Sequence, residues 1–316
     1  MIKTKEMPKT ADKQVIGAES LFLKYEQGEN ALTKALLHVL ESGGEELLKY
    51  VSEELELELP FPLLEYSTQK KCNTKDANGN DCHIIYDGRI APSNFELIIE
   101  SKITQNAINT AQLDRQVNYV DEQSKKRGNS KLLYLTTDKQ RPTKLNDPKY
   151  SHVAWTSWPA MIAILESFSN GSDVTETLLQ GLRGLYENIF ADTINVEDRV
   201  LILAGSYAEP IALEKGYYSC QVGRNFKNAG YLAFYYGKAI RHLFKITKGP
   251  FTYDGTDPEI GHGATMMKLK HVRTLAQPIL NDKKKGSKTI AFTQGSPRYC
   301  SLETFNNARF TTDLEK

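Results

Sequence analysis

An acidic and a basic residue stand two positions apart at the end of an apolar run. Glu100 and Lys102 follow Leu97–Ile99, and a second acid, Asp87, lies upstream beside a glycine. Side chains alternate between the two faces of a strand, so Glu100 and Lys102 share one face. Burying such charges is unfavourable unless they pair or bind a metal. The pattern predicts a site that cuts phosphodiester bonds, with a divalent cation held by the two acids and Lys102 beside the attacking water.

An acid and a lysine separated by one residue are weak evidence on their own. Two further triplets, Asp147–Lys149 and Asp282–Lys284, lie in polar, loop-like stretches, and we interpret them as solvated charges. The alternative for Glu100 and Lys102 is a structural ion pair at the end of a strand. Asp87 taken alone could be a turn former, because Asp-Gly dipeptides favour turns.

The composition predicts a soluble protein. Of the 316 residues, 40% are hydrophobic and 25% charged, and no apolar run is long enough to span a bilayer or to form a signal-peptide core. Four scattered cysteines do not suggest a disulfide framework, so a reducing cytoplasm is the expected location. No phosphate-binding loop, dinucleotide-binding glycine motif or zinc-protease motif is present.

Charge is distributed unevenly along the chain. Residues 1–194 carry 22 Lys and Arg against 28 Asp and Glu, whereas residues 195–316 carry 18 against 11. A basic C-terminal part favours a polyanionic partner, and the alternative is a merely solvated basic surface. We predict a catalytic domain over residues 1–170, a connecting helix over residues 171–195 and a β-rich basic recognition or sensor domain over residues 196–316.

Apolar periodicity and turn residues predict the order of the elements. In the first part, helices are expected over residues 29–40, 45–57, 105–127, 159–168 and 174–194. Strands are expected there over residues 63–70, 82–86, 95–103, 131–136 and 152–155. The second part alternates short apolar runs with glycine-containing turns, and strands are expected over residues 200–204, 217–222, 231–236, 240–246 and 289–293.

Cations and aromatic residues are interleaved in the basic C-terminal part. The candidate residues for binding a nucleic acid or a ligand are Arg224, Lys227, Tyr231, Tyr235 and Lys238. Aromatic rings can stack on bases while cations contact phosphates. The alternative is that these aromatic side chains fill a small β-sheet core. Residues 231–240 faintly resemble a strand pair of PUA-like barrels, which would imply binding of a modified or flipped base. A small nucleotide is the other ligand expected for this domain.

Residues 29–168 resemble the PD-(D/E)XK nuclease superfamily, which contains many restriction and repair endonucleases. The order of helix, three strands, helix and strand matches the core of that superfamily. Its two acids and its lysine correspond to Asp87, Glu100 and Lys102, although Tyr86 stands where the motif has proline. The resemblance implies an α/β fold, with a restriction-endonuclease-like mixed sheet flanked by helices and a smaller β-rich C-terminal domain.

The resemblance also implies further site residues. The acid that many members carry on the first helix corresponds to Glu29, with Glu19 in reserve, and the glutamine-bearing helix after the lysine corresponds to Gln112 and its neighbours. Gln112 would contact the phosphate or position Lys102. Mg²⁺, or Mn²⁺ in its place, would be held by Asp87, Glu100, the Ser101 carbonyl and Glu29.

The function implied by the resemblance is that of an Mg²⁺-dependent endonuclease acting on nucleic acid, with DNA as the expected substrate. Restriction or antiviral defence is the expected setting, and a homodimer is expected so that two sites can cut two strands. Two rivals stay open. One is an effector whose C-terminal domain binds a nucleotide signal that unlocks the nuclease, and the other is a catalytically inactive nucleic-acid-binding protein.

Overall fold

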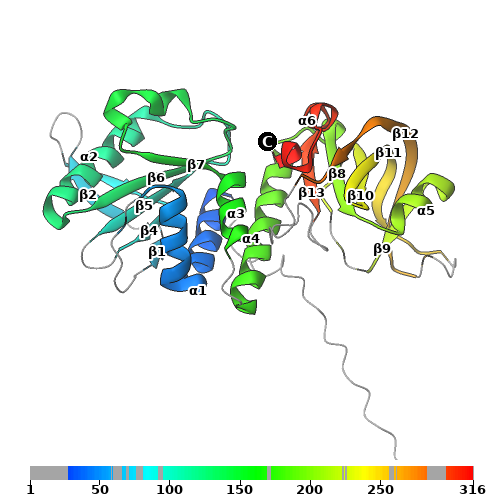
Figure 1. Ribbon diagram of the computed structural model, residues 1–316, viewed down its shortest axis with the longest axis horizontal. Helices are drawn as coiled ribbons and strands as arrows, with labels where there is room; N and C mark the ends of the chain where they lie inside the picture. Colours follow the sequence, from blue (N-terminus) through cyan, green and yellow to red (C-terminus); the bar gives the residue numbers. More distant parts are fainter. Residues whose placement is uncertain are drawn as a thin grey trace, which may run out of the picture.

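The structure is a computed structural model. It describes residues 28–57, 59, 66–68, 71–75, 81–91, 95–168, 172–222, 224, 226–255, 260, 262–282 and 297–315. Among these residues, no helix combines the length and the apolar character needed to cross a membrane. Two main sheets lie side by side, with the helices α3 and α4 between them (Figure 1).

The first sheet is mixed and has five strands in the order β1-β4-β5-β6-β7. The strands β4 and β5 are antiparallel, whereas β5, β6 and β7 run parallel. The bounds of its strands are β1 (Tyr66–Thr68), β4 (Gly88–Ile90), β5 (Glu96–Ser101), β6 (Ser130–Thr136) and β7 (Ala154–Ser157).

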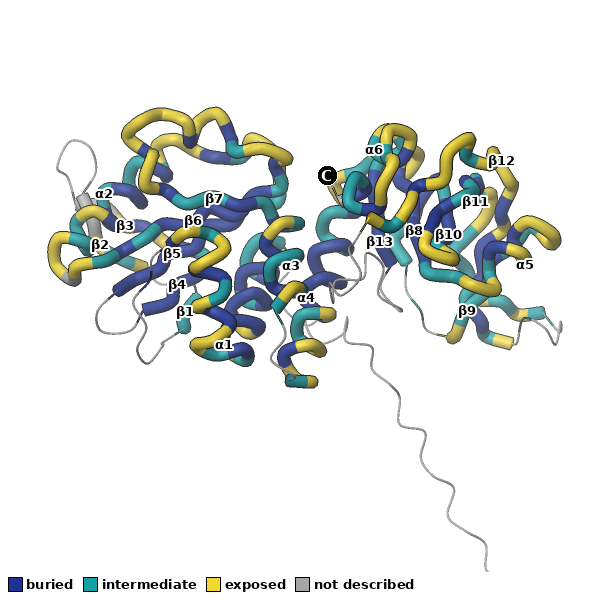
Figure 2. Tube along the Cα trace, in the orientation of Figure 1, coloured by how far each residue is buried: buried dark blue, intermediate teal, exposed yellow. Residues whose placement is uncertain are grey.

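Helices cover both faces of this sheet, so its central strands are buried (Figure 2). One face packs against α1 (Glu29–Glu54), α3 (Trp158–Ser167) and α4 (Asp173–Asp192), and the other packs against α2 (Thr110–Arg127). Along β5, Leu97 and Ile99 enter the first core and Ile98 enters the second. This alternation directs Glu100, two residues after Ile98, towards α2.

Several predicted elements differ from the observed ones. The predicted strand 82–86 is β3 (Asp81–Ile85), which pairs with the unpredicted β2 (Lys71–Lys75) in a separate two-stranded sheet. The predicted strand 63–70 is described only as β1, which pairs with β4. The helix predicted from residue 105 begins at Thr110, because Asn109 caps it by accepting a hydrogen bond from the Gln112 amide.

The two helices predicted over residues 29–40 and 45–57 correspond to the two halves of α1, which is kinked at Gly44 between them. Gly44 adopts a φ of 65°, a conformation that glycine tolerates and other residues rarely adopt. The short 3₁₀ helices are η2 (Thr143–Asn146), η3 (Pro148–Tyr150), η4 (Val196–Asp198) and η5 (Thr311–Glu315).

The second sheet has six strands in the order β13-β8-β10-β11-β12-β9, which confirms the α/β class with a smaller β-rich C-terminal part. Its bounds are β8 (Arg199–Ala204), β9 (Tyr217–Cys220), β10 (Tyr231–Tyr236), β11 (Ala239–Thr252), β12 (Thr265–Leu280) and β13 (Arg298–Ser301), with helices α5 (Ala208–Lys215) and α6 (Leu302–Asn307). The sequence analysis missed β12, β13 and both helices. The predicted strand 289–293 lies outside the described residues.

A buried cation of α4, Arg183, takes part in a chain of contacts from α3 to β13 of the second sheet. Arg183 donates through Nη2 to Glu166 of α3 at 2.7 Å and also through Nε, and its Nη1 lies 3.6 Å from Glu187. Glu187 in turn accepts from the backbone amide of Tyr299 in β13 at 3.2 Å. The ion pairs of Arg183 and the hydrogen bond of Glu187 together connect α3, α4 and β13. The proposed division into residues 1–170, 171–195 and 196–316 stays a prediction.

Candidate active site

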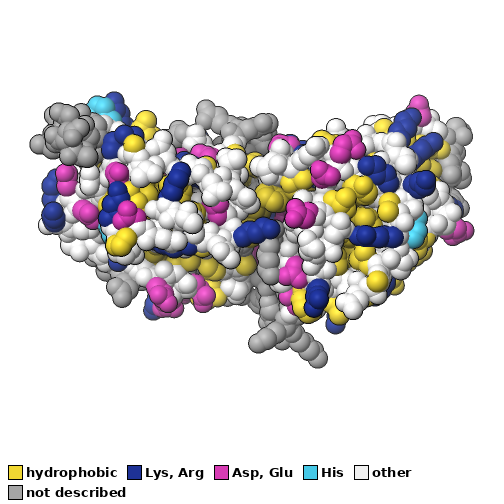
Figure 3. Space-filling model, turned by 90° about the horizontal axis from the view of Figure 1, so that it is seen from above, with side chains coloured by type: hydrophobic (Ala, Val, Ile, Leu, Met, Phe, Trp, Pro, Cys, Tyr) yellow, Lys and Arg dark blue, Asp and Glu magenta, His cyan; other side chains and the backbone are white. Residues whose placement is uncertain are grey.

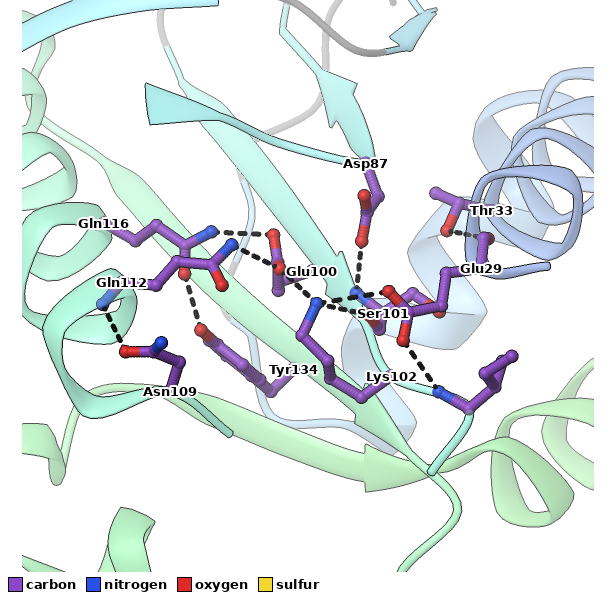
Figure 4. Close-up of polar contacts among 11 residues, drawn as sticks. Glu29, Thr33, Asp87, Glu100, Ser101, Lys102, Asn109, Gln112, Gln116 and Tyr134 are labelled. Carbon is purple, nitrogen blue, oxygen red and sulfur yellow. Dashed lines mark hydrogen bonds and ion pairs between the residues drawn. The ribbon is translucent and has the colours of Figure 1, made fainter. Parts of the chain in front are cut away.

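The end of β5 brings two acids and a lysine together (Figure 4). The Nζ of Lys102 lies 2.6 Å from Oε1 of Glu100 and 2.9 Å from the carbonyl oxygen of Ser101. Asp87 precedes the neighbouring strand β4, and its Oδ2 accepts from the Ser101 amide at 2.8 Å. Gly88 pairs with Ile99 across the two antiparallel strands, and this register places Asp87 beside the end of β5.

A third acid reaches the same place from the first residue of α1. One carboxylate oxygen of Glu29, Oε2, lies 3.4 Å from Nζ of Lys102, and the other accepts from the amide of Ile103 at 3.3 Å. The hydroxyl of Thr33 donates to the Glu29 carbonyl one turn later. The first-helix acid predicted as Glu29 therefore lies at the site, and its reserve, Glu19, lies outside the described residues.

Two glutamines of α2 hold the Glu100 carboxylate. The Nε2 of Gln112 donates to Oε1 at 2.7 Å, and the Nε2 of Gln116 donates to Oε2 at 2.7 Å. The hydroxyl of Tyr134 donates to Oε1 of Gln116 at 2.5 Å, which orients the amide so that its NH₂ faces Glu100. Sequence reasoning missed Gln116 and Tyr134, although Gln116 follows Gln112 by one helical turn on the same face.

The buried acids of this cluster have perturbed pKa values. Burial, followed by the negative charge of Asp87, raises the pKa of Glu100 from 4.5 to about 7, against the opposing effects of Lys102 and Gln116. Burial also raises the pKa of Asp87, although the Ser101 amide and Lys102 oppose it. Burial alone would lower the pKa of Lys102, but the surrounding carboxylates, Glu100 first, raise it.

Without metal, the contribution of Glu100 to the stability of the fold is expected to fall as the pH rises towards 7. Glu100 titrates near 4.5 in an unfolded chain and near 7 when folded, so between these values the folded state binds the proton more tightly. The stabilisation that this tighter proton binding gives the folded state is complete below pH 4.5 and is lost as the pH rises through about 7. The loss can reach about 3 kcal/mol. Denaturant unfolding in EDTA across this range measures it.

The Glu100→Gln variant should not show this component of the pH dependence. Glu197→Gln is a suitable control, because the Glu197 side chain is 78% exposed and the variant should follow the wild type. An unchanged pH dependence in Glu100→Gln contradicts the assignment of the shifted proton to Glu100.

The oxygen atoms at the end of β5 suit a hard divalent cation. In the described part of the chain, no three Asp, Glu, His or Cys side chains are arranged to hold a metal ion. However, one cation, the ammonium of Lys102, already bridges Glu100 Oε1 and the Ser101 carbonyl oxygen. Mg²⁺ prefers such carboxylate and carbonyl oxygens. Asp87, Glu100 and the Ser101 carbonyl therefore fit a magnesium ion in donor type, provided that Lys102 moves aside.

Loss of the Tyr134 hydroxyl is expected to weaken the response to Mg²⁺. In Tyr134→Phe, the Gln116 amide loses the hydrogen bond that orients it, so Oε2 of Glu100 is held less firmly, while Gln112 and Lys102 still contact Oε1. Groups that orient metal ligands typically contribute roughly 10-fold to 100-fold in metal affinity or activity. The Mg²⁺ concentration for a half-maximal shift of the melting temperature should rise accordingly. In the control Tyr150→Phe, a buried hydroxyl that donates to Asp114 is removed and the Mg²⁺ dependence should stay unchanged. Equal Mg²⁺ dependence in both variants contradicts the positioning role of Tyr134.

The predicted binding residues of the C-terminal part do not form one cluster. They are Arg224, Lys227, Tyr231, Tyr235 and Lys238. Arg224 lies over the ring of Phe226, which packs in the core on one face of the second sheet. Tyr231 and Tyr235 are partly buried against the core of the opposite face, as the alternative interpretation expected. Lys238 is exposed in the turn between β10 and β11.

Comparisons with known proteins do not identify a family for this chain. No protein-family model matches the chain, and no curated protein matches it. A similar solved structure is the small subunit of the heterodimeric restriction endonuclease R.BspD6I, which is 14% identical in sequence with a TM-score of 0.20. The match covers 45% of this chain and 59% of that subunit. A TM-score this low supports no conclusion about this chain.

Proposed function

We propose that the chain is a metal-dependent nuclease of the PD-(D/E)XK kind that hydrolyses phosphodiester bonds of nucleic acid, with DNA as its substrate. The observation that carries the proposal is the convergence of Asp87, Glu100 and Lys102 at the end of β5, with 2.6 Å between Lys102 Nζ and Glu100 Oε1. A structural ion pair needs one acid and one lysine. Here Glu29 and Glu100 both pair with the Lys102 ammonium, and Asp87 is held beside them by the Ser101 amide, so three acids surround one lysine with excess negative charge.

The excess negative charge is the feature that a divalent cation would balance. The residues that would hold Mg²⁺, or Mn²⁺ in its place, are Asp87, Glu100, the Ser101 carbonyl and Glu29. When bound, such an ion supplies Lewis-acid stabilisation of the charge on the phosphoryl oxygens.

The side chains around the ion would have distinct tasks. Lys102 would orient the attacking water and offset the negative charge that develops in the transition state. Gln116 holds Oε2 of Glu100, which leaves Oε1 as the oxygen that faces the lysine. Gln112, which donates to Oε1, would contact the phosphate or keep Lys102 in position.

Plasmid cleavage by the purified protein in Mg²⁺ tests this function. We expect nicked or linear DNA, no product in EDTA, and product with Mn²⁺ in place of Mg²⁺. Parallel reactions with RNA, with modified and unmodified DNA, and with added nucleotides separate the rivals. Salt-sensitive DNA retention without cleavage in any of these reactions contradicts the nuclease proposal and favours an inactive binding protein. Cleavage only after a nucleotide is added favours the signal-activated effector.

A homodimer acting in restriction or antiviral defence is the setting we propose. Two sites in one particle can cut both strands in a single encounter, so linear plasmid should form without accumulation of the nicked intermediate. Light scattering of the purified protein gives its mass independently. A monomer that first nicks nearly all of the plasmid contradicts the dimer.

A further inference from the structure

Four lysines stand in two directly opposed pairs on the hairpin formed by β11 and β12. Lys245 is opposite Lys270, and Lys248 is opposite Lys268. Lys245 is half-buried and the other three are exposed. We call these four residues the lysine face. Like charges directly opposite each other on neighbouring strands are destabilising, so the bare hairpin keeps a repulsion that a bound anion would relieve.

The register directs all four side chains to the same side of the second sheet. Along β12, Met267 and Leu269 alternate with Lys268 and Lys270 and are buried in the core on the opposite side. Ile246 of β11 packs against that same core. A shift of the register between Ile246 and Lys248 offsets the alternation along β11, so that Lys248 as well as Lys245 lies opposite a lysine of β12. Residues directly opposite each other in an antiparallel pair share a face, so the β11 lysines point the same way as the β12 lysines.

Acidic residues compensate little of this charge. In the part of the chain that the structure describes, Lys245 pairs with Glu197 at 3.3 Å, and the Glu197 side chain is 78% exposed. Such a surface ion pair is worth at most about 1 kcal/mol. Lys245 and Lys248 also lie over the rings of Tyr231 and Phe251, at 4.5 and 4.9 Å from the ring centres. The lysine face therefore remains positive.

Basic side chains are visible around an apolar patch on the half of the molecule that the second sheet forms (Figure 3). A cleft of about 620 Å³ separates the residues that follow Lys102 from α6. One wall of this cleft is Ile103–Gln105, directly after Lys102, and part of the other wall is α6. On α6, Asn306 accepts from Arg273 of β12, the strand that carries two of the four lysines. Charged residues of both signs line the cleft, namely Lys139, Arg309, Glu303 and Asp313.

We propose that the lysine face binds the phosphate backbone of a DNA molecule that extends from the candidate active site across the cleft. The identity of the ligand rests on the proposed function. Each lysine that meets a phosphate releases counterions, so the contribution of the lysine face falls as the salt concentration rises. Backbone contacts carry no sequence information. The lysine face therefore holds and orients the substrate without selecting a sequence.

The double variant Lys268→Gln/Lys270→Gln tests the proposal by fluorescence anisotropy with a labelled DNA duplex in EDTA. Both side chains are exposed, so the fold should persist, and a melting curve checks this. We expect the affinity to fall about tenfold and the slope of log affinity against log salt to shrink by about 2. The control Lys125→Gln/Lys126→Gln removes two exposed lysines of α2 and should change neither quantity.

Binding in EDTA separates this inference from the proposed function. A wild-type protein that binds DNA through the lysine face but never cuts it refutes the nuclease and leaves the inference intact. A double variant that binds DNA as tightly as the wild type, with the same salt slope, overturns the inference. An affinity loss confined to an RNA duplex overturns the choice of DNA.

Discussion

Replacing Lys102 with alanine is expected to slow Mg²⁺-dependent DNA cleavage roughly a thousandfold, the scale on which charge stabilisation at an active site acts. Among the described residues, no other Lys or Arg is paired with Glu100, and Nζ of Lys102 lies 2.6 Å from it. The ammonium and a metal ion would compete for Glu100 Oε1 and the Ser101 carbonyl. The variant should therefore bind Mg²⁺ at least as tightly as the wild type, and more Mg²⁺ should not restore its rate.

A matched control for this prediction is Lys149→Ala. Lys149 closes a similar acid-x-Lys triplet, but its side chain is 50% exposed and pairs with Asp114 at 2.9 Å. Its removal should leave the cleavage rate unchanged. Melting curves show whether both variants fold, and Lys102→Met preserves the length of the side chain if the alanine variant is unstable. Cleavage by a folded Lys102 variant within tenfold of the wild type shows that Lys102 is only a structural ion-pair partner.

Replacing Arg183 with leucine is expected to lower the free energy of unfolding by about 3 to 5 kcal/mol, the usual cost of breaking a buried ion pair from one side. Arg183 is 4% exposed and contacts Glu166 and Glu187. Without the Arg183 guanidinium, the carboxylates of Glu166 and Glu187 lose its positive charge while they stay largely buried where α3, α4 and β13 meet. Guanidinium unfolding measures the loss.

The exposed pair of Lys227 with Asp192 is the control for Arg183. Its atoms lie 2.7 Å apart, but the two side chains are 37% and 59% exposed. Water screens such a pair, so Lys227→Leu should change stability by no more than about 1 kcal/mol. Similar losses in both variants contradict the view that burial of Arg183 is what makes it important.

The sequence was sufficient to predict that Asp87, Glu100 and Lys102 lie together at the end of β5, because their pattern is local. Glu100 and Lys102 are two residues apart on one strand, and Asp87 precedes the strand beside it. The support of Glu100 by Tyr134 was not predictable in this way. Tyr134 lies beside Glu100, and can support it through Gln116, only because β5 and β6 run parallel in a register that pairs these two residues. A register between distant segments cannot be derived from local periodicity.

The missed elements of the fold have physical explanations of their own. Strand β12 alternates buried residues with exposed lysines such as Lys268 and Lys270, so it has no continuous apolar run. The run over residues 82–86 suggested a strand of the main sheet, but Ile85 is 57% exposed and its strand pairs with β2 in a small hairpin. Apolar content alone did not distinguish a central strand from a peripheral one.

Locating a bound Mn²⁺ by its anomalous scattering in crystals of the protein tests the central claim most directly. We expect a peak within coordination distance of Asp87, Glu100 and the Ser101 carbonyl in the wild type, and its loss in Glu100→Gln. A peak elsewhere, or no peak at this position at saturating Mn²⁺, contradicts a metal-dependent hydrolytic site at the end of β5.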